Sequence, residues 1–187
     1  MSDKFNQPLK ENVLPKNLTH LTFGNKFNQP INENVLPNNL THLSFNYESE
    51  FNQQINENVL PNSLTHLDFG IIFNQPINEN VLPNSLTHLT FCYQNSFNYL
   101  INKNVLPNNL THLIFGYCFN QPINENVLPN SLIHLEFGND FNKQININVL
   151  PNTLEEIIIR KESQKLLFLD DKFKNIIKII TNHYYIL

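Results

Sequence analysis

One stretch of sequence decides the fold of this chain: residues 27–45 read FNQPINENVLPNNLTHLSF. The motif recurs along most of the 187 residues, and its leading Phe-Asn pair begins at Phe5, Phe27, Phe51, Phe73, Phe97, Phe119 and Phe141. The intervals between these positions are 22, 24, 22, 24, 22 and 22 residues. A short repeat of nearly constant length is typical of a solenoid, in which each copy forms one coil and stacks on the next.

The two halves of the motif predict different local structures. From His42 to Phe45 the residues alternate between polar and apolar, which is the period of a half-buried strand. Pro37 has no backbone N–H to donate to a ladder, so the strand should begin after it. Residues 28–37 contain two prolines and no helical period, which favours an extended or turn-like path. Each coil should therefore consist of one short strand and a non-helical return segment.

The motif also resembles known repeats. Leu-x-x-Leu-x-Phe following Leu-Pro is similar to the leucine-rich repeat in a short form without convex helices. The Phe-Asn-x-Pro-Ile core resembles, more specifically, the FNIP repeat family of leucine-rich-repeat relatives, over about residues 5–160. This resemblance implies one repeat domain over residues 1–160, a right-handed β-solenoid of parallel strands. Many relatives carry an F-box that recruits a ubiquitin ligase, but the short segment before Phe5 has no room for one, so we do not carry that role over.

The pattern changes near residue 160. Residues 154–159 should form a last strand, because they end in three consecutive isoleucines and no Phe-Asn pair follows. Asp170 is a candidate helix N-cap, and apolar residues then recur at helical spacing at Phe173, Ile176, Ile177, Ile180 and Tyr184. We therefore expect residues 161–187 to form a C-terminal helical cap over the last coil.

Composition excludes several classes of function. The formal net charge of −4 provides no basic field for a phosphate backbone, so nucleic acid is not an expected partner. No apolar run is long enough to span a bilayer, and the N-terminus lacks the apolar core of a signal peptide. The expected location is the cytoplasm of the producing or host cell. We find no nucleophile–base pattern, phosphate-binding glycine loop or metalloprotease motif, so the sequence predicts neither enzyme activity nor a cofactor.

A column of histidines is the most conspicuous candidate site. His20 begins it, and the candidate binding residues are His42, His66, His88, His112 and His134. Each precedes an inward leucine, so each should point out of the concave face, about 4.8 Å from the next. Three interpretations remain open: a structural ladder, a pH sensor, or a metal site, since imidazole titrates near neutrality and binds transition metals. A straight column presents ligands from one direction only, whereas tetrahedral sites need several, which favours the structural ladder.

A second column consists of the asparagines of the Phe-Asn pairs. Its members include Asn28, Asn52, Asn74, Asn98, Asn120 and Asn142. Asparagine side chains bond backbone groups at tight corners. The column should therefore be a structural ladder that satisfies backbone amides between adjacent coils.

Positions that vary between repeats are better candidates for recognition. Tyr47, Tyr93 and Tyr117 follow the strands, and tyrosine is enriched at interfaces. The position two residues after each histidine differs between repeats, and its members include Asp68 and Glu136. We expect a non-catalytic scaffold that binds a protein partner through this face and rim. The alternative is an architectural protein that self-associates through its N-terminal end, and a metal-binding or enzymatic role ranks third.

Overall fold

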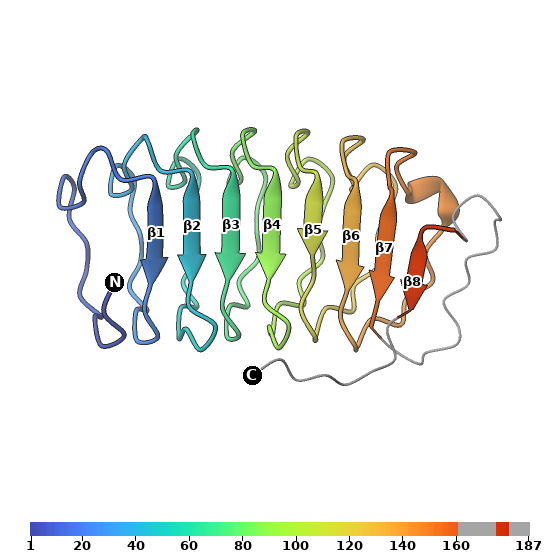
Figure 1. Ribbon diagram of the computed structural model, residues 1–187, viewed down its shortest axis with the longest axis horizontal. Helices are drawn as coiled ribbons and strands as arrows, with labels where there is room; N and C mark the ends of the chain where they lie inside the picture. The colour runs from blue at the N-terminus through green and yellow to red at the C-terminus, as the bar shows by residue number, and fades with distance from the viewer. Residues whose placement is uncertain (161–174, 180–187) are drawn as a thin grey trace.

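A computed structural model describes residues 1–160 and 175–179 of the chain. It is a parallel β-solenoid in which each coil contributes one strand to a single eight-stranded sheet, in sequence order (Figure 1). The strands are β1 (His20–Phe23), β2 (His42–Phe45), β3 (His66–Phe69), β4 (His88–Phe91), β5 (His112–Ile114), β6 (His134–Phe137), β7 (Glu156–Ile159) and β8 (Ile177–Ile179). One short 3-10 helix, η1 (Ile147–Val149), lies on the return segment of the last coil.

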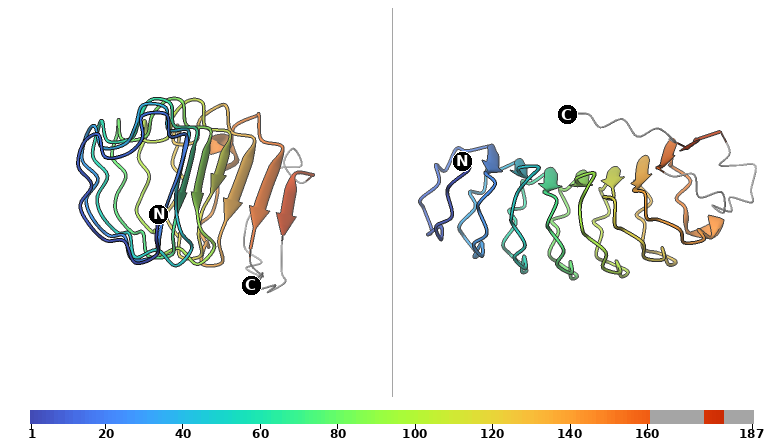
Figure 2. Two further views of the ribbon diagram at one scale, coloured as in Figure 1. Left: turned by 60° about the vertical axis from the view of Figure 1, so that its left-hand side comes forward. Right: turned by 90° about the horizontal axis from the view of Figure 1, so that it is seen from below.

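The strands pair in exact register from coil to coil. His42 pairs with His66 and Leu43 with Leu67, and the same correspondence holds along β1 to β6. Histidine and the residue two positions later face outward, whereas the intervening leucine and the final phenylalanine are buried. The predicted alternation is therefore confirmed. The row of strands lines the concave side of the gently curved stack (Figure 2).

The core is a continuous double stack of phenylalanine rings. The ring centroids of Phe69 and Phe73, on either side of the turn that joins two coils, are 3.8 Å apart, and Phe73 lies 6.1 Å from Phe51 at the start of the preceding coil. Leucine, isoleucine and valine of the motif fill the remaining interior, and Leu64 and Leu67 are fully buried. Because each ring contacts rings above and below, a coil acquires most of its apolar burial from its neighbours.

Two asparagine positions shape the return segment. The asparagines of Phe-Asn form a ladder in which each Oδ1 accepts the backbone N–H of the next, for example Asn74 from Asn98 at 3.2 Å and Asn98 from Asn120 at 2.8 Å. A different set has positive φ between 60° and 67°, namely Asn12, Asn34, Asn58, Asn80, Asn104 and Asn126. These residues precede the motif valine and turn the chain through the left-handed region, which asparagine tolerates better than most residues.

The longer coils are accommodated by glycines in the coils that follow. In the two coils of 24 residues the extra loop residues include a fully buried Ser49 or Asn95. A Cβ on Gly70 would lie 2.6 Å from the Asn46 carbonyl oxygen, and one on Gly116 would lie 2.5 Å from Asn95 Cβ. Each glycine thus leaves room for the long loop of the preceding coil.

The expected C-terminal helical cap is wrong where the structure describes it. Residues 177–179 form β8, which pairs in parallel with β7, and Ile157 N–H donates to the Ile176 carbonyl at 2.8 Å. A β-branched Ile-Ile-Lys-Ile segment favours a strand, and the open edge of β7 supplies its partner. The rest of the expected cap, 161–174 and 180–187, lies outside the described residues. Within the described part of the chain, no helix has the length and apolar character to cross a bilayer.

Candidate interaction face

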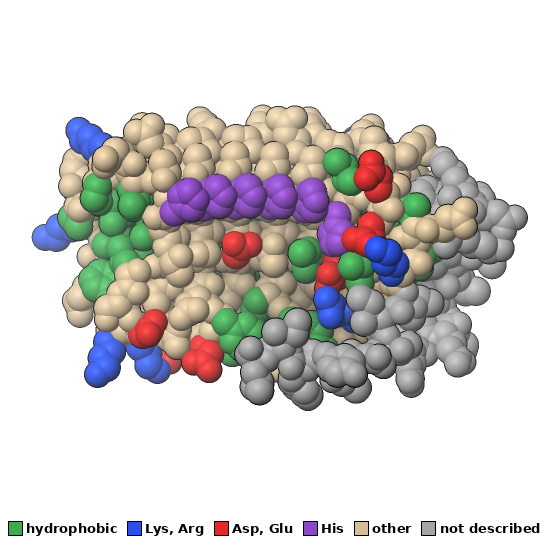
Figure 3. Space-filling model, viewed as in Figure 1, with side chains coloured by type: hydrophobic (Ala, Val, Ile, Leu, Met, Phe, Trp, Pro, Cys, Tyr) green, Lys and Arg blue, Asp and Glu red, His purple; other side chains and the backbone are tan. Residues whose placement is uncertain are grey.

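The histidines form one stacked row along the concave face (Figure 3). Ring centroids are 4.1 Å apart for the three pairs from His20 to His88 and 4.3 Å apart for His88 and His112, with interplanar angles of 9° to 12°. We call these five residues, His20, His42, His66, His88 and His112, the histidine ladder. His134 departs from it, because its ring lies 5.7 Å from that of His112 and is tilted by 23°.

A threonine holds each ring of the histidine ladder. The preceding threonine places Oγ1 2.9 Å from Nδ1 in the pairs Thr19–His20, Thr41–His42, Thr65–His66, Thr87–His88 and Thr111–His112. Four of these hydroxyls also donate, at 3.0 to 3.1 Å, to the carbonyl oxygen of the equivalent threonine one coil earlier. At His134 the preceding residue is Ile133, which has no hydroxyl, so the regular arrangement ends there.

Burial lowers the pKa of three histidines of the ladder. The pKa of His88 is lowered to about 4, first by burial and then by the neighbouring imidazoles of His66 and His112. Burial is also the first cause that lowers the pKa of His42 and His112, followed by adjacent histidines. Repulsion between imidazoles therefore contributes to the lowered pKa values, but desolvation contributes more.

A second outward row runs beside the histidines. Its N-terminal members are hydroxyls, and Thr22 Oγ1 lies 2.8 Å from Ser44 Oγ. Asp68 follows, with a hydrogen bond to Thr90, and burial raises the pKa of its carboxyl. None of the strands from β1 to β7 carries a lysine or arginine. The outward positions of these strands therefore carry no lysine or arginine charge.

The C-terminal end of the face carries a network of ion pairs. Glu136 is 7% exposed, and its carboxylate accepts a hydrogen bond from Arg160 Nε. The guanidinium of Arg160 lies 5.3 Å from the centroid of the Tyr93 ring. His134 Nδ1 lies 2.8 Å from Glu156 Oε2, and Lys178 of β8 pairs with the other oxygen of that carboxylate. The hydrogen bond from Lys178 is the largest cause of the lowered pKa of Glu156. The structure thus brings His134, Glu136 and Tyr93 into one cluster.

Large side chains are exposed along the edge where the strands end. Tyr47, Tyr93 and Tyr117 are 47%, 37% and 38% exposed, and Ile72 is 41% exposed. We call these four residues the tyrosine rim. Tyr93 and Tyr117 meet edge to face at 6.2 Å, and the Tyr117 N–H donates to the Tyr93 carbonyl at 2.7 Å. The rim therefore borders the concave face near the ion-pair network.

Sequence reasoning missed several members of this surface. Arg160, Lys178 and Glu156 were not candidates, because the repeat pattern fades there and their partners lie about one coil away. Ile72 was also missed, although its position directly after the residue equivalent to Tyr47 was a usable signal. Tyr99 and Leu100, 42% and 41% exposed, form a separate apolar pair on the return segment of their coil.

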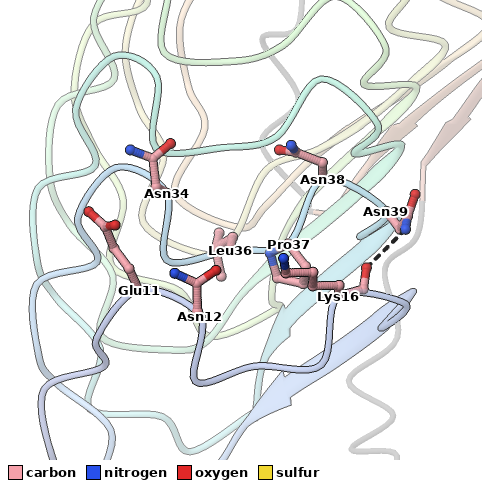
Figure 4. A pocket seen from close by; sticks show the side chains of 8 residues that line it. All are labelled: Glu11, Asn12, Lys16, Asn34, Leu36, Pro37, Asn38 and Asn39. Atoms are coloured by element: carbon pink, nitrogen blue, oxygen red, sulfur yellow. Dashed lines mark hydrogen bonds between the residues drawn. The ribbon is translucent and has the colours of Figure 1, made fainter.

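The opposite edge, where the strands begin, carries pockets lined by asparagine. One of about 410 Å³ lies between the first two coils and is lined by Glu11, Asn12, Lys16, Asn34, Leu36, Pro37, Asn38 and Asn39 (Figure 4). Asn39 Nδ2 donates across it to the Lys16 carbonyl at 2.9 Å. A smaller pocket of about 260 Å³ repeats this lining three coils further on. Their recurrence marks them as grooves between stacked turns.

The described residues contain no group of three or more histidine, cysteine, aspartate or glutamate side chains arranged to hold a metal ion. In the histidine ladder the rings are stacked almost parallel, so their nitrogen lone pairs do not converge on one point. A tetrahedral metal site needs ligands from several directions. The geometry therefore supports the ladder interpretation over the metal interpretation.

Comparison with known proteins agrees with the fold. No curated protein matches the chain. A solved structure, CroV588, described as a novel circular LRR protein, superposes with a TM-score of 0.80 at 66% sequence identity. The match covers 84% of this chain but only 22% of that one. The FNIP repeat matches residues 5–48, 48–71, 73–118 and 119–161, which is most of the sequence, and the chain belongs to the FNIP repeat family.

Proposed function

We propose that this protein is a non-catalytic scaffold that binds another protein across its concave face and tyrosine rim. The exposure of the rim carries the proposal. In the coils around it almost every large apolar side chain is buried, yet Tyr47, Ile72, Tyr93 and Tyr117 remain 37% to 47% exposed. Full burial of an exposed apolar side chain contributes about 1.5–3 kcal/mol, and each of these half-exposed side chains would contribute part of that. Clustered aromatic side chains beside a polar face are the usual composition of a binding hot spot.

The neighbouring charges support the same surface. Arg160 stacks on Tyr93 while it pairs with the buried Glu136, so an aromatic side chain, a cation and an anion share one cluster. The row beside the histidine ladder differs from coil to coil, with Asp68, Ile114 and Glu136 among its members. A surface that only propagates a stack needs no such variation. The diversity therefore favours recognition of a specific partner.

Site-specific photocrosslinking tests this proposal. A photoreactive phenylalanine analogue is placed at Tyr93 on the rim or, as a matched control, at Tyr99 on the return segment, since the two are 37% and 42% exposed. In the producing cell we expect one defined protein to crosslink through position 93 and not through position 99. Addition of Tyr47→Ser and Tyr117→Ser to the position 93 protein should weaken that crosslink. Equal crosslinking from both positions, or none from position 93, would contradict the proposal.

A second candidate function is architectural, and one observation favours it. Val13 in the first coil is 59% exposed, whereas the equivalent Val35 in the next coil is 3% exposed. An apolar coil face of this kind fits a coil of the same type on a second copy. Self-association would appear as a mass that rises with protein concentration in sedimentation, and Val13→Glu should abolish the rise. A constant monomer mass would leave the recognition function as the sole proposal.

A further inference from the structure

The threonine–histidine pairs fix which nitrogen of each imidazole carries the proton. Thr87 Oγ1 lies 3.1 Å from the Thr65 carbonyl oxygen and 2.9 Å from His88 Nδ1. A carbonyl oxygen only accepts, and a hydroxyl has one proton to donate. The hydroxyl proton is therefore directed to the carbonyl, and the hydroxyl oxygen must accept a proton from Nδ1–H.

The same reasoning applies to four consecutive rings. Their threonines all make both contacts, so His42, His66, His88 and His112 each carry a proton on Nδ1. The Nε2 atom of each ring has no hydrogen-bond partner among the described residues, and in a neutral ring with its proton on Nδ1 this atom is an acceptor. Because the rings stack at 4.1 to 4.3 Å, these Nε2 atoms form a line of acceptors along the concave face.

The surroundings make this line more attractive to cations. Asp68 faces outward on β3, two residues after His66, and its hydrogen-bond partner is the neutral Thr90. The positive charges at the end of the face are already engaged, since Arg160 pairs with Glu136 and Lys178 with Glu156. No strand from β1 to β7 contributes a lysine or arginine of its own.

We propose that the histidine ladder and Asp68 select an extended, arginine- or lysine-bearing segment of a partner protein, whose N–H groups donate to the Nε2 atoms and whose charge pairs with Asp68. This rests on the proposed function, because it specifies the chemistry of the partner on the same face. Threonine acts here as a positioning residue. Without its hydroxyl, nothing would hold the imidazole in the Nδ1–H form.

The protonation state of the rings is the first test. Long-range ¹H–¹⁵N spectra of the full chain at pH 7.5 distinguish the two neutral imidazole forms. We expect His42, His66, His88 and His112 to show the Nδ1–H pattern. Thr87→Val, which removes one hydroxyl, should shift His88 toward the Nε2–H form, whereas the control Thr22→Val, outside these pairs, should not. An Nε2–H pattern throughout the parent protein would overturn the proposal.

Binding of defined peptides is the second test. The probes are two flexible Gly-Ser peptides of equal length, one bearing arginines and the other glutamates. The arginine peptide should bind and shift the His66 and His88 signals. Asp68→Asn should weaken this binding about tenfold, a loss of about 1.4 kcal/mol. The control Glu79→Gln removes an equal charge from the return segment and should have little effect.

The outcomes separate this inference from the function on which it rests. Equal binding of both peptides, equal effects of Asp68→Asn and Glu79→Gln, or no arginine-peptide binding would each overturn the choice of a basic segment. Crosslinking from Tyr93 to a partner would still support a recognition face in those cases. Loss of that crosslink together with retained arginine-peptide binding would instead leave the ladder chemistry intact and remove the rim from the proposed function.

Discussion

The histidine ladder and the C-terminal end of the sheet share one backbone arrangement but differ in the chemistry of their surfaces. Along the ladder, imidazole rings stack at 4.1 to 4.3 Å, and each is held by a threonine hydroxyl. From His134 onward the strands keep their register, since His134 pairs with Glu156 of β7 in the position of the next histidine. The outward side chains there form ion pairs instead of ring stacks.

This difference shows that the outward side chains do not determine the coil. Ile133 replaces threonine and Glu156 replaces histidine, yet β6 and β7 pair as the earlier strands do. The features common to both regions are the buried leucine or isoleucine and the aromatic stack beneath the sheet. The core therefore sets the fold, and the concave surface is free to carry recognition chemistry.

The largest expected effect comes from the shared core. Phe97 lies 4.3 Å from Phe91, and Phe141 lies 4.0 Å from Phe137, so both regions contain the same aromatic contact. Phe97→Ala and Phe141→Ala should each lower the free energy of unfolding by about 3–5 kcal/mol. The exposed control Tyr99→Ala should change it by less than about 0.5 kcal/mol. Urea denaturation measures all three, and a much smaller loss for Phe141→Ala would show that the last coil is a separate unit.

A smaller effect should distinguish the two ion pairs at the C-terminal end. The Glu136 side chain is 10% exposed, so Arg160→Ala leaves a largely buried carboxylate without its cation. This substitution should lower the free energy of unfolding by about 1.5–3 kcal/mol. The side chain of Lys178 is 67% exposed, so Lys178→Ala should lower the free energy of unfolding by less than about 1 kcal/mol. Equal losses in thermal or urea unfolding would mean that burial of Glu136 does not strengthen its pairing.

The smallest expected effect depends on pH and belongs to the ladder. The folded pKa of His88 is lowered to about 4, below the unfolded value near 6.5, so the unfolded chain binds its proton first as pH falls. The stability contributed by the neutral ring is complete above about pH 6.5 and is lost as pH falls toward about 4. Between pH 7.5 and 5.5 the parent should lose about 1 kcal/mol more than His88→Gln.

Repeating this measurement at high salt separates the two causes of the lowered His88 pKa. Repulsion between imidazoles is screened by salt, whereas the desolvation of a buried ring is not. Because burial is the first cause of the lowered His88 pKa, most of the difference between parent and His88→Gln should persist at high ionic strength. Its disappearance in salt would show that the neighbouring rings, and not burial, control the ladder.

The repeat made most of the fold predictable, and departures from it marked the failures. The His-Leu-x-Phe pattern predicted the strands, their alternation and their order because every copy supports the same assignment. The helix expected at residues 177–179 was wrong because Ile176 and Ile177 fit a helical spacing and a strand equally well in isolation. The tyrosines of the rim were found from their position after the strands, but Arg160 was not, since its contact with Tyr93 crosses several coils.

The sequence by itself determined the coil length, the inward and outward faces, and the columns of identical side chains, because a repeat of constant length places equivalent residues at equivalent positions. Only the tertiary structure decided how those columns interact. The Nδ1 contact of His88 requires Thr87 to bond a carbonyl one coil away, and the pairing of Lys178 with Glu156 requires β8 to add to the sheet. Such contacts depend on distances and directions between coils, which a linear pattern does not contain.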